Sequence, residues 1–281
     1  MPVRTTKFHE MKQEGMPIPC ITAYDYPTAK LADAAGIPLI LVGDSLGNVV
    51  LGYDSTTYVT MDDMIRHTQA VARGARNALV VADMPFMSYQ INADEAVRNA
   101  GRLVQEAGAH AVKLEGGAAV AETVARITSA GIPVLGHLGL TPQSVNQLGG
   151  YRVQGRTLSQ AQRLLEDAAK LEEAGAFGIV LESVPGLLAQ MLTNRIHIPT
   201  IGIGAGAGCD GQIQVLHDVL GLSHRLPKHA KQYANLTRII EQAIAAYAND
   251  VRDRNFPTEE HSTEIDNAVM CELQDGMDIA H

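Results

Sequence analysis

Eight short apolar runs, each followed by residues with a helical pattern, constrain the fold of this 281-residue chain more than any other feature. The runs are rich in Val, Ile and Leu and lack regular alternation, which is typical of strands covered by helices outside and packed inside. Strands that alternate with helices predict a parallel sheet with right-handed crossovers. Eight such units satisfy barrel closure better than an open doubly wound sheet, and a barrel of this kind needs about 250 residues. We therefore predict a single-domain α/β fold, the (β/α)8 TIM barrel, with strands in residues 17–25, 37–45, 78–86, 110–117, 132–140, 177–185, 198–206 and 213–221.

Several of the intervening helices carry their own end signals. Thr60 with Asp63, and Asn92 with Glu95, have the spacing of an N-terminal cap with an acid three residues later. Glycines follow four of the helical patterns, where C-terminal caps belong, at Gly36, Gly108, Gly131 and Gly175. These signals support the order of strands and helices independently of the apolar runs.

Three segments divide the chain. Residues 1–16 have the pattern of a short amphipathic helix outside the eight units, and residues 17–250 comprise the barrel with a C-terminal helix. From about Arg252 the sequence is polar and acidic without a clear period, so we expect residues 251–281 to form a poorly ordered tail.

Composition and charge exclude several classes of protein. The net charge of -9 is spread along the chain, and no run of Lys and Arg offers the basic stripe that nucleic acid or an anionic membrane would need. The apolar runs are far too short to span a bilayer, and the first residues lack the apolar core of an export signal. The three cysteines are odd in number and far apart, which disfavours disulfides and zinc and favours a cytoplasmic location.

Polar residues end six of the apolar runs. In a (β/α)8 barrel the active site gathers at the carboxyl ends of the strands, so these residues are the candidate site. Any one of them could instead cap the next helix or brace a turn. The set consists of Asp25, Asp44 with Ser45, Asp83, Lys113 with Glu115, His137, and Glu182.

Three of these carboxylates predict a metal. Asp44, Asp83 and Glu115 would face one another at the barrel mouth, where their mutual repulsion requires a cation. Without clustered His and Cys, the carboxylates favour Mg2+ over zinc. The alternative is a structural salt-bridge network with Lys113. Because Lys113 is two residues before Glu115, both side chains should point to the same face, one toward a metal and the other toward a substrate anion.

Two further residues have a functional and a structural interpretation. Glu182 ends the sixth run and could act as a general base, because a carboxyl group in a partly apolar mouth can have a raised pKa. It could equally cap the helix that begins near Pro185 and Gly186. His137 could line the site, although a lone histidine near a strand end is more often a structural hydrogen-bond donor.

The glycine-rich stretch at residues 202–212, GIGAGAGCDGQ, does not fit the patterns of nucleotide-binding loops. Its glycines would instead permit close backbone passage at the mouth, or form a tight turn.

Seven motifs in order resemble one enzyme family. They are ITAYDYPTAKLADAAG, LVGDSLGNVVLGYDSTTYVT, ADMPFMSY, VKLEGG, GHLGLTPQSVNQLGGYRVQGR, LESVP and IGIGAGAGCDGQIQVLHD. Together they resemble the ketopantoate hydroxymethyltransferase family from about residue 4 to residue 262, which is nearly the whole chain. The residues after Ser262 extend beyond the usual end of that family.

The resemblance implies transfer of a hydroxymethyl group from the co-substrate 5,10-methylenetetrahydrofolate to 3-methyl-2-oxobutanoate, which gives 2-dehydropantoate for pantothenate synthesis. It also implies a TIM barrel, a bound Mg2+ that stabilises an enolate, and a homo-oligomer, commonly a decamer. The family's metal-site residues match Asp44, Asp83 and Glu115, some of which act through water. Its oxo-acid site matches Asp44, Ser45, Asp83 and Lys113, and its proposed catalytic base matches Glu182.

Two other functions remain open from the residues alone. A Mg2+-dependent C–C lyase or phosphoenolpyruvate mutase-like barrel would use the same metal and a 2-oxo acid but no folate. A catalytically silent binding protein on a barrel scaffold would have lost the strand-end acids, all of which are present here.

Overall fold

The computed structural model describes residues 3–223 and 225–278 of the chain. The chain divides into two compact units, Met1–Tyr233 and Ala234–His281. Among the described residues, no helix combines the length and apolar character needed to cross a bilayer.

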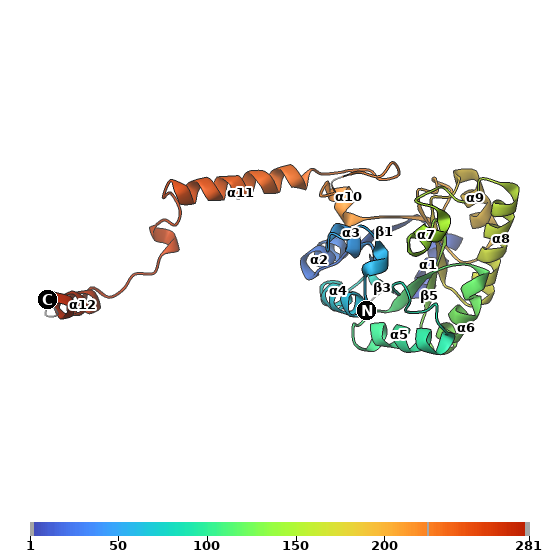
Figure 1. Cartoon of the computed structure of the whole chain (residues 1–281), viewed down its shortest axis with the longest axis horizontal. Helices are drawn as coiled ribbons and strands as arrows, with labels where there is room; N and C mark the ends of the chain where they lie inside the picture. The colour runs from blue at the N-terminus through green and yellow to red at the C-terminus, as the bar shows by residue number, and fades with distance from the viewer. Residues whose placement is uncertain (1–2, 224, 279–281) are drawn as a thin grey trace. The chain divides into compact units, whose positions relative to one another are not determined.

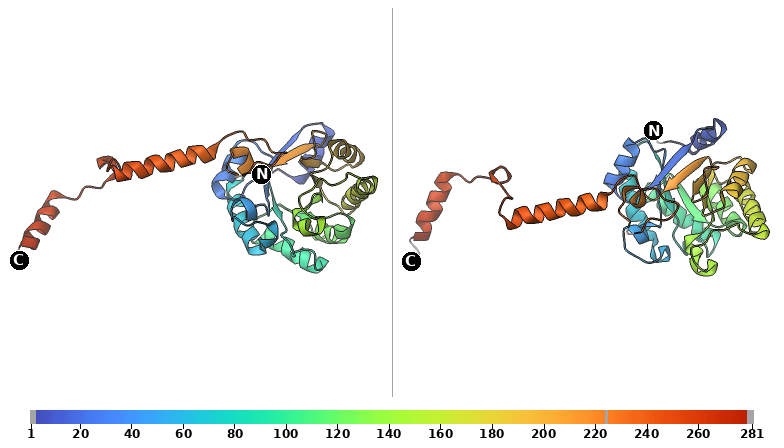
Figure 2. Two further views of the ribbon diagram at one scale, coloured as in Figure 1. Left: turned by 45° about the horizontal axis from the view of Figure 1, so that its top comes forward. Right: turned by 90° about the horizontal axis from the view of Figure 1, so that it is seen from above.

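The first unit is a closed barrel of eight parallel strands in sequential order, which confirms the TIM-barrel prediction (Figures 1 and 2). In the register of the sheet, Asp83 lies beside Lys113, Glu115 beside His137, and Gly139 beside Glu182. The sheet therefore brings the polar strand ends together at one level of the barrel. The strands are β1 Ile18–Thr22, β2 Leu39–Val42, β3 Leu79–Asp83, β4 Ala111–Glu115, β5 Val134–Gly139, β6 Gly178–Glu182, β7 Thr200–Ile203 and β8 Gly211–Gln214.

The prediction for the eighth strand was misplaced. The strand occupies Gly211–Gln214, and most of the predicted run 213–221 forms the short helix α10, Leu216–Leu220. A short apolar run does not distinguish a strand from a buried helical segment. Gly211 is needed at the strand because a Cβ there would collide with the backbone oxygen and side chain of Ile18 in β1.

The predicted helix caps are present. Thr60 and Asp63 form a reciprocal capping box, and the Asn92 side chain accepts a hydrogen bond from the Glu95 N–H. The four glycines predicted at helix ends all have positive φ. The helices of this unit, apart from α10, are α1 Thr5–Gln13, α2 Tyr26–Ala34, α3 Leu46–Val49, α4 Met61–Gly74, α5 Ala93–Gln105, α6 Ala121–Ser129, α7 Val145–Leu148, α8 Leu158–Glu173 and α9 Gly186–Arg195, with 3-10 turns η1 Thr56–Tyr58, η2 Ala118–Val120 and η3 Pro142–Ser144.

The first unit contains two buried apolar clusters. The larger one fills the layer between the strands and the helices. The smaller one fills the interior of the barrel with Leu, Ile, Val and Ala side chains of the strands, and Phe8 of α1 packs into it. The barrel is thus closed by side chains at one end, which leaves the carboxyl ends of the strands for the site.

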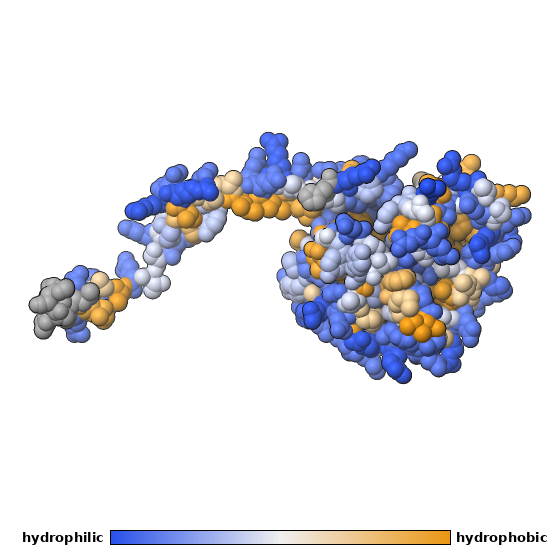
Figure 3. All heavy atoms as spheres, in the orientation of Figure 1, coloured by the Kyte–Doolittle hydropathy of each residue, from blue (hydrophilic) through white to orange (hydrophobic). Residues whose placement is uncertain are grey.

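The second unit contains α11, Leu236–Arg252, the 3-10 turn η4, Glu259–His261, and α12, Asn267–Asp278. The sequence predicts a poorly ordered tail in residues 251–281, and the structure has η4 and α12 within that segment. The degree of order of the tail stays a prediction. Ile240, Ile244 and Tyr247 on α11 are exposed, and Figure 3 shows the apolar surface of this helix. The division of the chain at residue 250 stays a prediction.

Candidate active site

A cavity of about 730 Å3 opens at the carboxyl ends of the strands. Its lining includes every residue that the sequence predicted for the site except Asp25. Asp25 instead caps α2, where its carboxylate accepts a hydrogen bond from the Thr28 N–H at 2.8 Å. The predicted residues that the cavity brings together are Asp44, Ser45, Asp83, Lys113, Glu115, His137 and Glu182.

The first wall of the cavity comes from β2 and β3. Asp44 follows β2, and its N–H donates to Asp83 Oδ2 at 3.0 Å, which ties the ends of the two strands together. Ser45 shares a hydrogen bond with the hydroxyl of Tyr24 at 2.9 Å. The first strand contributes Thr22 to the lining of the cavity, and Tyr24, just beyond β1, contacts the site through Ser45.

Lys113 lies at the centre of the charged residues. Its ammonium is 2.9 Å from Asp83 Oδ1 and 3.4 Å from His137 Nδ1, and all three side chains are buried. Burial alone would lower the pKa of Lys113, but the neighbouring Asp83 and Glu115 carboxylates outweigh burial and raise it. Lys113 is therefore a fixed positive charge in the cavity.

His137 connects the two glutamates of the site. Its Nδ1 lies 3.4 Å from Glu115 Oε1, and its Nε2 lies 3.3 Å from Glu182 Oε2. Burial and the charge of Lys113 lower the pKa of His137, but contacts with the two glutamates prevail and raise it to about 9. A protonated His137 would hold both carboxylates in place.

Glu182 is the most accessible of these acids, with 18% of its side chain exposed. The next residue, Ser183, has a left-handed backbone with φ of 50°, which is uncommon outside glycine and turns the chain sharply after β6. Among the described residues, no side chain caps α9, so the alternative role of Glu182 as a helix cap has no support here.

The carboxylates of the site fit a hard cation by their charge and burial. Burial, together with Asp83 and Glu115, raises the pKa of Asp44 well above its ordinary range. Asp83 Oδ1 accepts no hydrogen bond of good geometry from the described residues, although Lys113 lies close to it. A divalent cation would offset this repulsion.

The same carboxylates do not converge as a complete ligand cage. Within the part of the chain that the structure describes, no three His, Cys, Asp or Glu side chains are arranged to hold one ion.

Sequence reasoning missed two buried residues of the site, Tyr89 and Gln143. Gln143 Nε2 donates to Asp44 Oδ2 at 2.9 Å, and the Tyr89 hydroxyl donates to Gln143 Oε1 at 2.8 Å. Both residues lie within quoted motifs, ADMPFMSY and GHLGLTPQ. Their loops lack the strand period that identified the other residues, so the motifs were the available signal.

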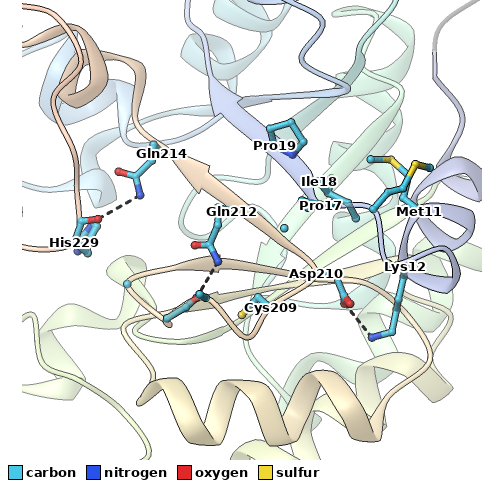
Figure 4. Close-up of a pocket in the computed structure, with 16 residues that line it drawn as sticks. Met11, Lys12, Pro17, Ile18, Pro19, Cys209, Asp210, Gln212, Gln214 and His229 are labelled. Atoms are coloured by element: carbon cyan, nitrogen blue, oxygen red, sulfur yellow. Dashed lines mark hydrogen bonds and ion pairs between the residues drawn. The ribbon is translucent and has the colours of Figure 1, made fainter.

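A larger cavity of about 840 Å3 lies elsewhere, between the end of α1 and the loop that joins β7 to β8 (Figure 4). None of the predicted site residues lines it. Lys12 and Asp210 form an ion pair of 2.9 Å at its edge. The glycine-rich stretch borders this cavity, and Gly206 passes so close to Gly186 that a Cβ would be 3.0 Å from the Gly186 Cα. Close backbone passage is therefore one use of these glycines.

The sequence profile described as Ketopantoate hydroxymethyltransferase matches residues 2–259. The chain belongs to this family. It is 59% identical over 272 residues to the 3-methyl-2-oxobutanoate hydroxymethyltransferase of Chloroflexus aurantiacus, with 96% of each chain covered. It is 58% identical over 275 residues to the protein of that name from Dehalococcoides mccartyi, with 97% of this chain and 98% of the relative covered. These matches confirm the predicted family. Its members are named as hydroxymethyltransferases, so the chain is a transferase enzyme.

Solved structures that share the fold are more distant. A phosphonopyruvate hydrolase complex with oxalate and Mg2+ superposes with a TM-score of 0.60 at 15% identity, with 99% of this chain and 98% of that chain covered. A 2,3-dimethylmalate lyase of the phosphoenolpyruvate mutase and isocitrate lyase superfamily gives a TM-score of 0.58 at 15% identity, with 100% and 98% covered. At this identity the likeness shows the fold, and the family assignment comes from the close relatives.

Proposed function

We propose that the protein transfers a hydroxymethyl group from 5,10-methylenetetrahydrofolate to 3-methyl-2-oxobutanoate and so forms 2-dehydropantoate. The single observation that carries this proposal is one cavity in which the strand-end acids, Lys113 and Glu182 meet. The proposal is supported by the names of relatives that are 58–59% identical over nearly the whole chain.

Asp44, Asp83 and Glu115 would hold a Mg2+ ion, in part through water. When bound, the ion would act as a Lewis acid toward the carbonyl and carboxylate oxygens of the oxo acid. The three acids fit this role because they are buried and line one cavity, where burial and the charges of Asp83 and Glu115 raise the pKa of Asp44. The chain's own contribution is to fix their positions before the ion arrives.

Lys113 and Ser45 would bind the oxo acid together with Asp44 and Asp83. The Lys113 ammonium is buried beside Asp83, so its charge is not screened by bulk water. It would stabilise the negative charge that develops on the ketone oxygen. Ser45, held by Tyr24, would donate its hydroxyl proton to a substrate oxygen.

Glu182 would take the proton from C3 of the oxo acid. The C–H bond breaks, the proton moves to Glu182, and the electron pair passes to the ketone oxygen. Water cleaves the two C–N bonds of the folate methylene group, which releases tetrahydrofolate and a formaldehyde equivalent. C3 then attacks the formaldehyde carbon and forms the new C–C bond as the ketone re-forms. The electron pair of the formaldehyde C=O bond passes to its oxygen, which takes a proton and becomes the hydroxyl group. Glu182 can serve as this base because it lines the cavity from β6, opposite the acids of β2 and β3, and its Oε2 lies 3.3 Å from His137 Nε2.

The cavity offers room for a second substrate. Its volume is in the range for drug-sized ligands, well above the need of a five-carbon acid. Arg152, Arg225 and Lys228 also line it and are exposed, so they would attract the glutamate carboxylates of folate.

Arg225→Ala tests whether these exposed basic residues bind folate. We expect the KM for methylenetetrahydrofolate to rise about fivefold, while the affinity for the oxo acid stays the same. Arg156→Ala is the matched control, since Arg156 is exposed on the same loop as Arg152 but does not line the cavity. Equal KM values for both variants would remove Arg225 from the folate site.

The principal experiment is exchange of the C3 proton of 3-methyl-2-oxobutanoate in D2O, followed by NMR with and without Mg2+. We expect exchange that depends on Mg2+, then 2-dehydropantoate after methylenetetrahydrofolate is added. Glu182→Gln should slow exchange by a factor of about 100 to 10,000 because an amide is no base at neutral pH. Undiminished exchange in this variant would exclude Glu182 as the base.

The same experiment tests the alternative of a lyase or mutase that acts on a 2-oxo acid without folate. The fold neighbours named phosphonopyruvate hydrolase and 2,3-dimethylmalate lyase make this the second candidate. Folded, metal-loaded protein that neither exchanges the proton nor makes product would favour the alternative.

Two wider predictions accompany this function. The resemblance to the family predicts a homo-oligomer, with a decamer expected, and the exposed apolar side chains of α11 are compatible with self-association. Light scattering coupled to size-exclusion chromatography measures the oligomeric state directly.

Free cysteines in the described chain, together with the composition, support a cytoplasmic location.

A further inference from the structure

Gln143 connects three strands at the mouth of the barrel without being on any of them. It lies in the 3-10 turn η3 that follows β5, and it is buried. Its side chain donates to Asp44 Oδ2 at 2.9 Å and to the Met84 carbonyl at 3.0 Å. Its backbone N–H donates to Glu115 Oε2 at 3.0 Å. One residue thus contacts the ends of β2, β3 and β4, which supply the three acids of the proposed metal site.

The amide of Gln143 has every hydrogen-bonding group satisfied. Nε2 has two hydrogens, and each has an acceptor in Asp44 or Met84. Oε1 accepts from the Tyr89 hydroxyl at 2.8 Å and from Gln90 Nε2 at 3.1 Å. A flipped amide would place its oxygen against two acceptors and its nitrogen against two donors. The network therefore determines the orientation of the amide.

The Tyr89 hydroxyl connects the Gln143 amide to the end of β4. Its hydroxyl also contacts the backbone of Glu115, accepting from the N–H at 3.1 Å and lying 3.2 Å from the carbonyl oxygen. Tyr89 and Gln143 are both buried, so these hydrogen bonds are shielded from water. The two residues form a rigid link between the strand ends and the η3 turn.

This link has a specific consequence for the two carboxylates. Each has one oxygen committed to Gln143, Asp44 through Oδ2 and Glu115 through Oε2. No described residue donates a hydrogen bond to the other oxygen of Asp44, which remains available to a cation.

We infer that Gln143 is a positioning residue of the metal site, which fixes the orientation of the Asp44 and Glu115 carboxylates and so sets the affinity for a divalent cation. It acts through these acids and is not a catalytic residue. The inference rests on the proposed metal site and adds to it a residue outside the ligand set. Replacement of a residue that orients a metal ligand typically reduces metal affinity or activity about 10–100-fold.

The variant that tests this role is Gln143→Met. Methionine conserves the volume of the side chain and removes both donors and the acceptor, while the backbone N–H to Glu115 remains. We expect Mn2+, measured by electron paramagnetic resonance of the free ion, to bind the full-length variant about 10–100-fold more weakly than the wild type. At saturating metal, kcat should return toward the wild-type value, because Gln143 binds no substrate.

Gln147→Met is the matched control. Gln147 is exposed on α7, four residues after Gln143, and lies outside the network that orients the amide. Its Mn2+ affinity should stay within about twofold of the wild type, since surface substitutions have small effects. Thermal unfolding of both variants without metal establishes that each is folded.

The outcomes separate this inference from the proposed function. Wild-type protein that binds no Mn2+ would overturn the metal site and the inference together. Wild-type protein that binds Mn2+, with equal affinity in folded Gln143→Met, would overturn the inference alone. If Gln143→Met does not fold, Tyr89→Phe removes one oxygen from the same network. Tyr89→Phe should weaken Mn2+ binding, and unchanged affinity would again overturn the role of the link.

Discussion

The two ends of the barrel interior are built from the same strands but from opposite kinds of side chain. Along the inner face of β3, Leu79 and Val81 are followed by Asp83. Along β4, Ala111 is followed by Lys113 and then by Glu115. Residues at i, i+2 and i+4 share one face of a strand, so one face changes from apolar to charged within five residues.

The apolar end of the barrel interior stabilises the fold, whereas the charged end forms the candidate active site. The apolar end gains free energy from burial and is closed by Phe8 of α1. The charged end brings buried acids close together, and the raised pKa of Asp44 shows that the ionised form of this acid is unfavourable there. Substitutions at the apolar end should therefore reduce stability with little effect on chemistry, and substitutions at the charged end should do the reverse.

Phe8→Ala should have the largest effect on stability. Phe8 is 1% exposed, and its ring centroid lies 6.2 Å from that of Phe177. Loss of the ring leaves a cavity at the closed end, so the free energy of unfolding should fall by about 3–5 kcal/mol. Urea denaturation measures this loss, and proton exchange per folded molecule should stay at the wild-type rate.

His9→Ala provides the control for Phe8, because His9 is exposed on the same helix. It should change the free energy of unfolding by less than about 0.5 kcal/mol. If Phe8→Ala were as stable as His9→Ala, the closed end would not be the stabilising part of the interior.

Asp44→Asn should raise the free energy of unfolding of the metal-free protein, whereas Phe8→Ala should lower it. In metal-free protein, the stability contributed by Asp44 is fully present below its ordinary pKa and is lost as the pH rises through the raised pKa of the folded state. The neutral asparagine avoids this loss, so at pH 8 the variant should have a higher free energy of unfolding than the metal-free wild type. Mg2+ should stabilise the wild type and not the variant.

Thermal unfolding from pH 4 to pH 8, with and without Mg2+, measures both effects of Asp44→Asn. The wild type without metal should lose stability across this range more steeply than the variant. A variant that is less stable than the metal-free wild type at pH 8 would show that the charged end does not oppose folding.

The sequence predicted the charged end well because strand geometry determines it. Asp83, Lys113, Glu115 and His137 end parallel strands, so the register of the sheet places them side by side. Gln143 could not be predicted in this way. It reaches Asp44, which is 99 positions earlier in the chain, from a turn whose path no periodic pattern specifies.

The eighth strand and Asp25 show two further limits of the sequence. Residues 216–220 are apolar enough for a strand and form α10, because a run of that length fits either element. Asp25 and Asp44 both follow apolar runs, and the pattern of apolar runs alone does not distinguish them. The chain after β1 turns into α2 at once, so Asp25 is exposed at the start of a helix, whereas Asp44 remains inside the mouth.

Asp25→Ala should have the smallest effect. The Asp25 carboxylate accepts hydrogen bonds from the N–H of Thr28 at 2.8 Å and from its hydroxyl at 2.6 Å. Loss of this cap should reduce the free energy of unfolding by about 1 kcal/mol. Because the carboxylate points into α2 and does not line the cavity, Mn2+ affinity should equal that of the wild type. Weaker Mn2+ binding in this variant would mean that the residues after the first strand also contribute an acid to the metal site. Asp25 could then not be distinguished from Asp44 as a capping residue.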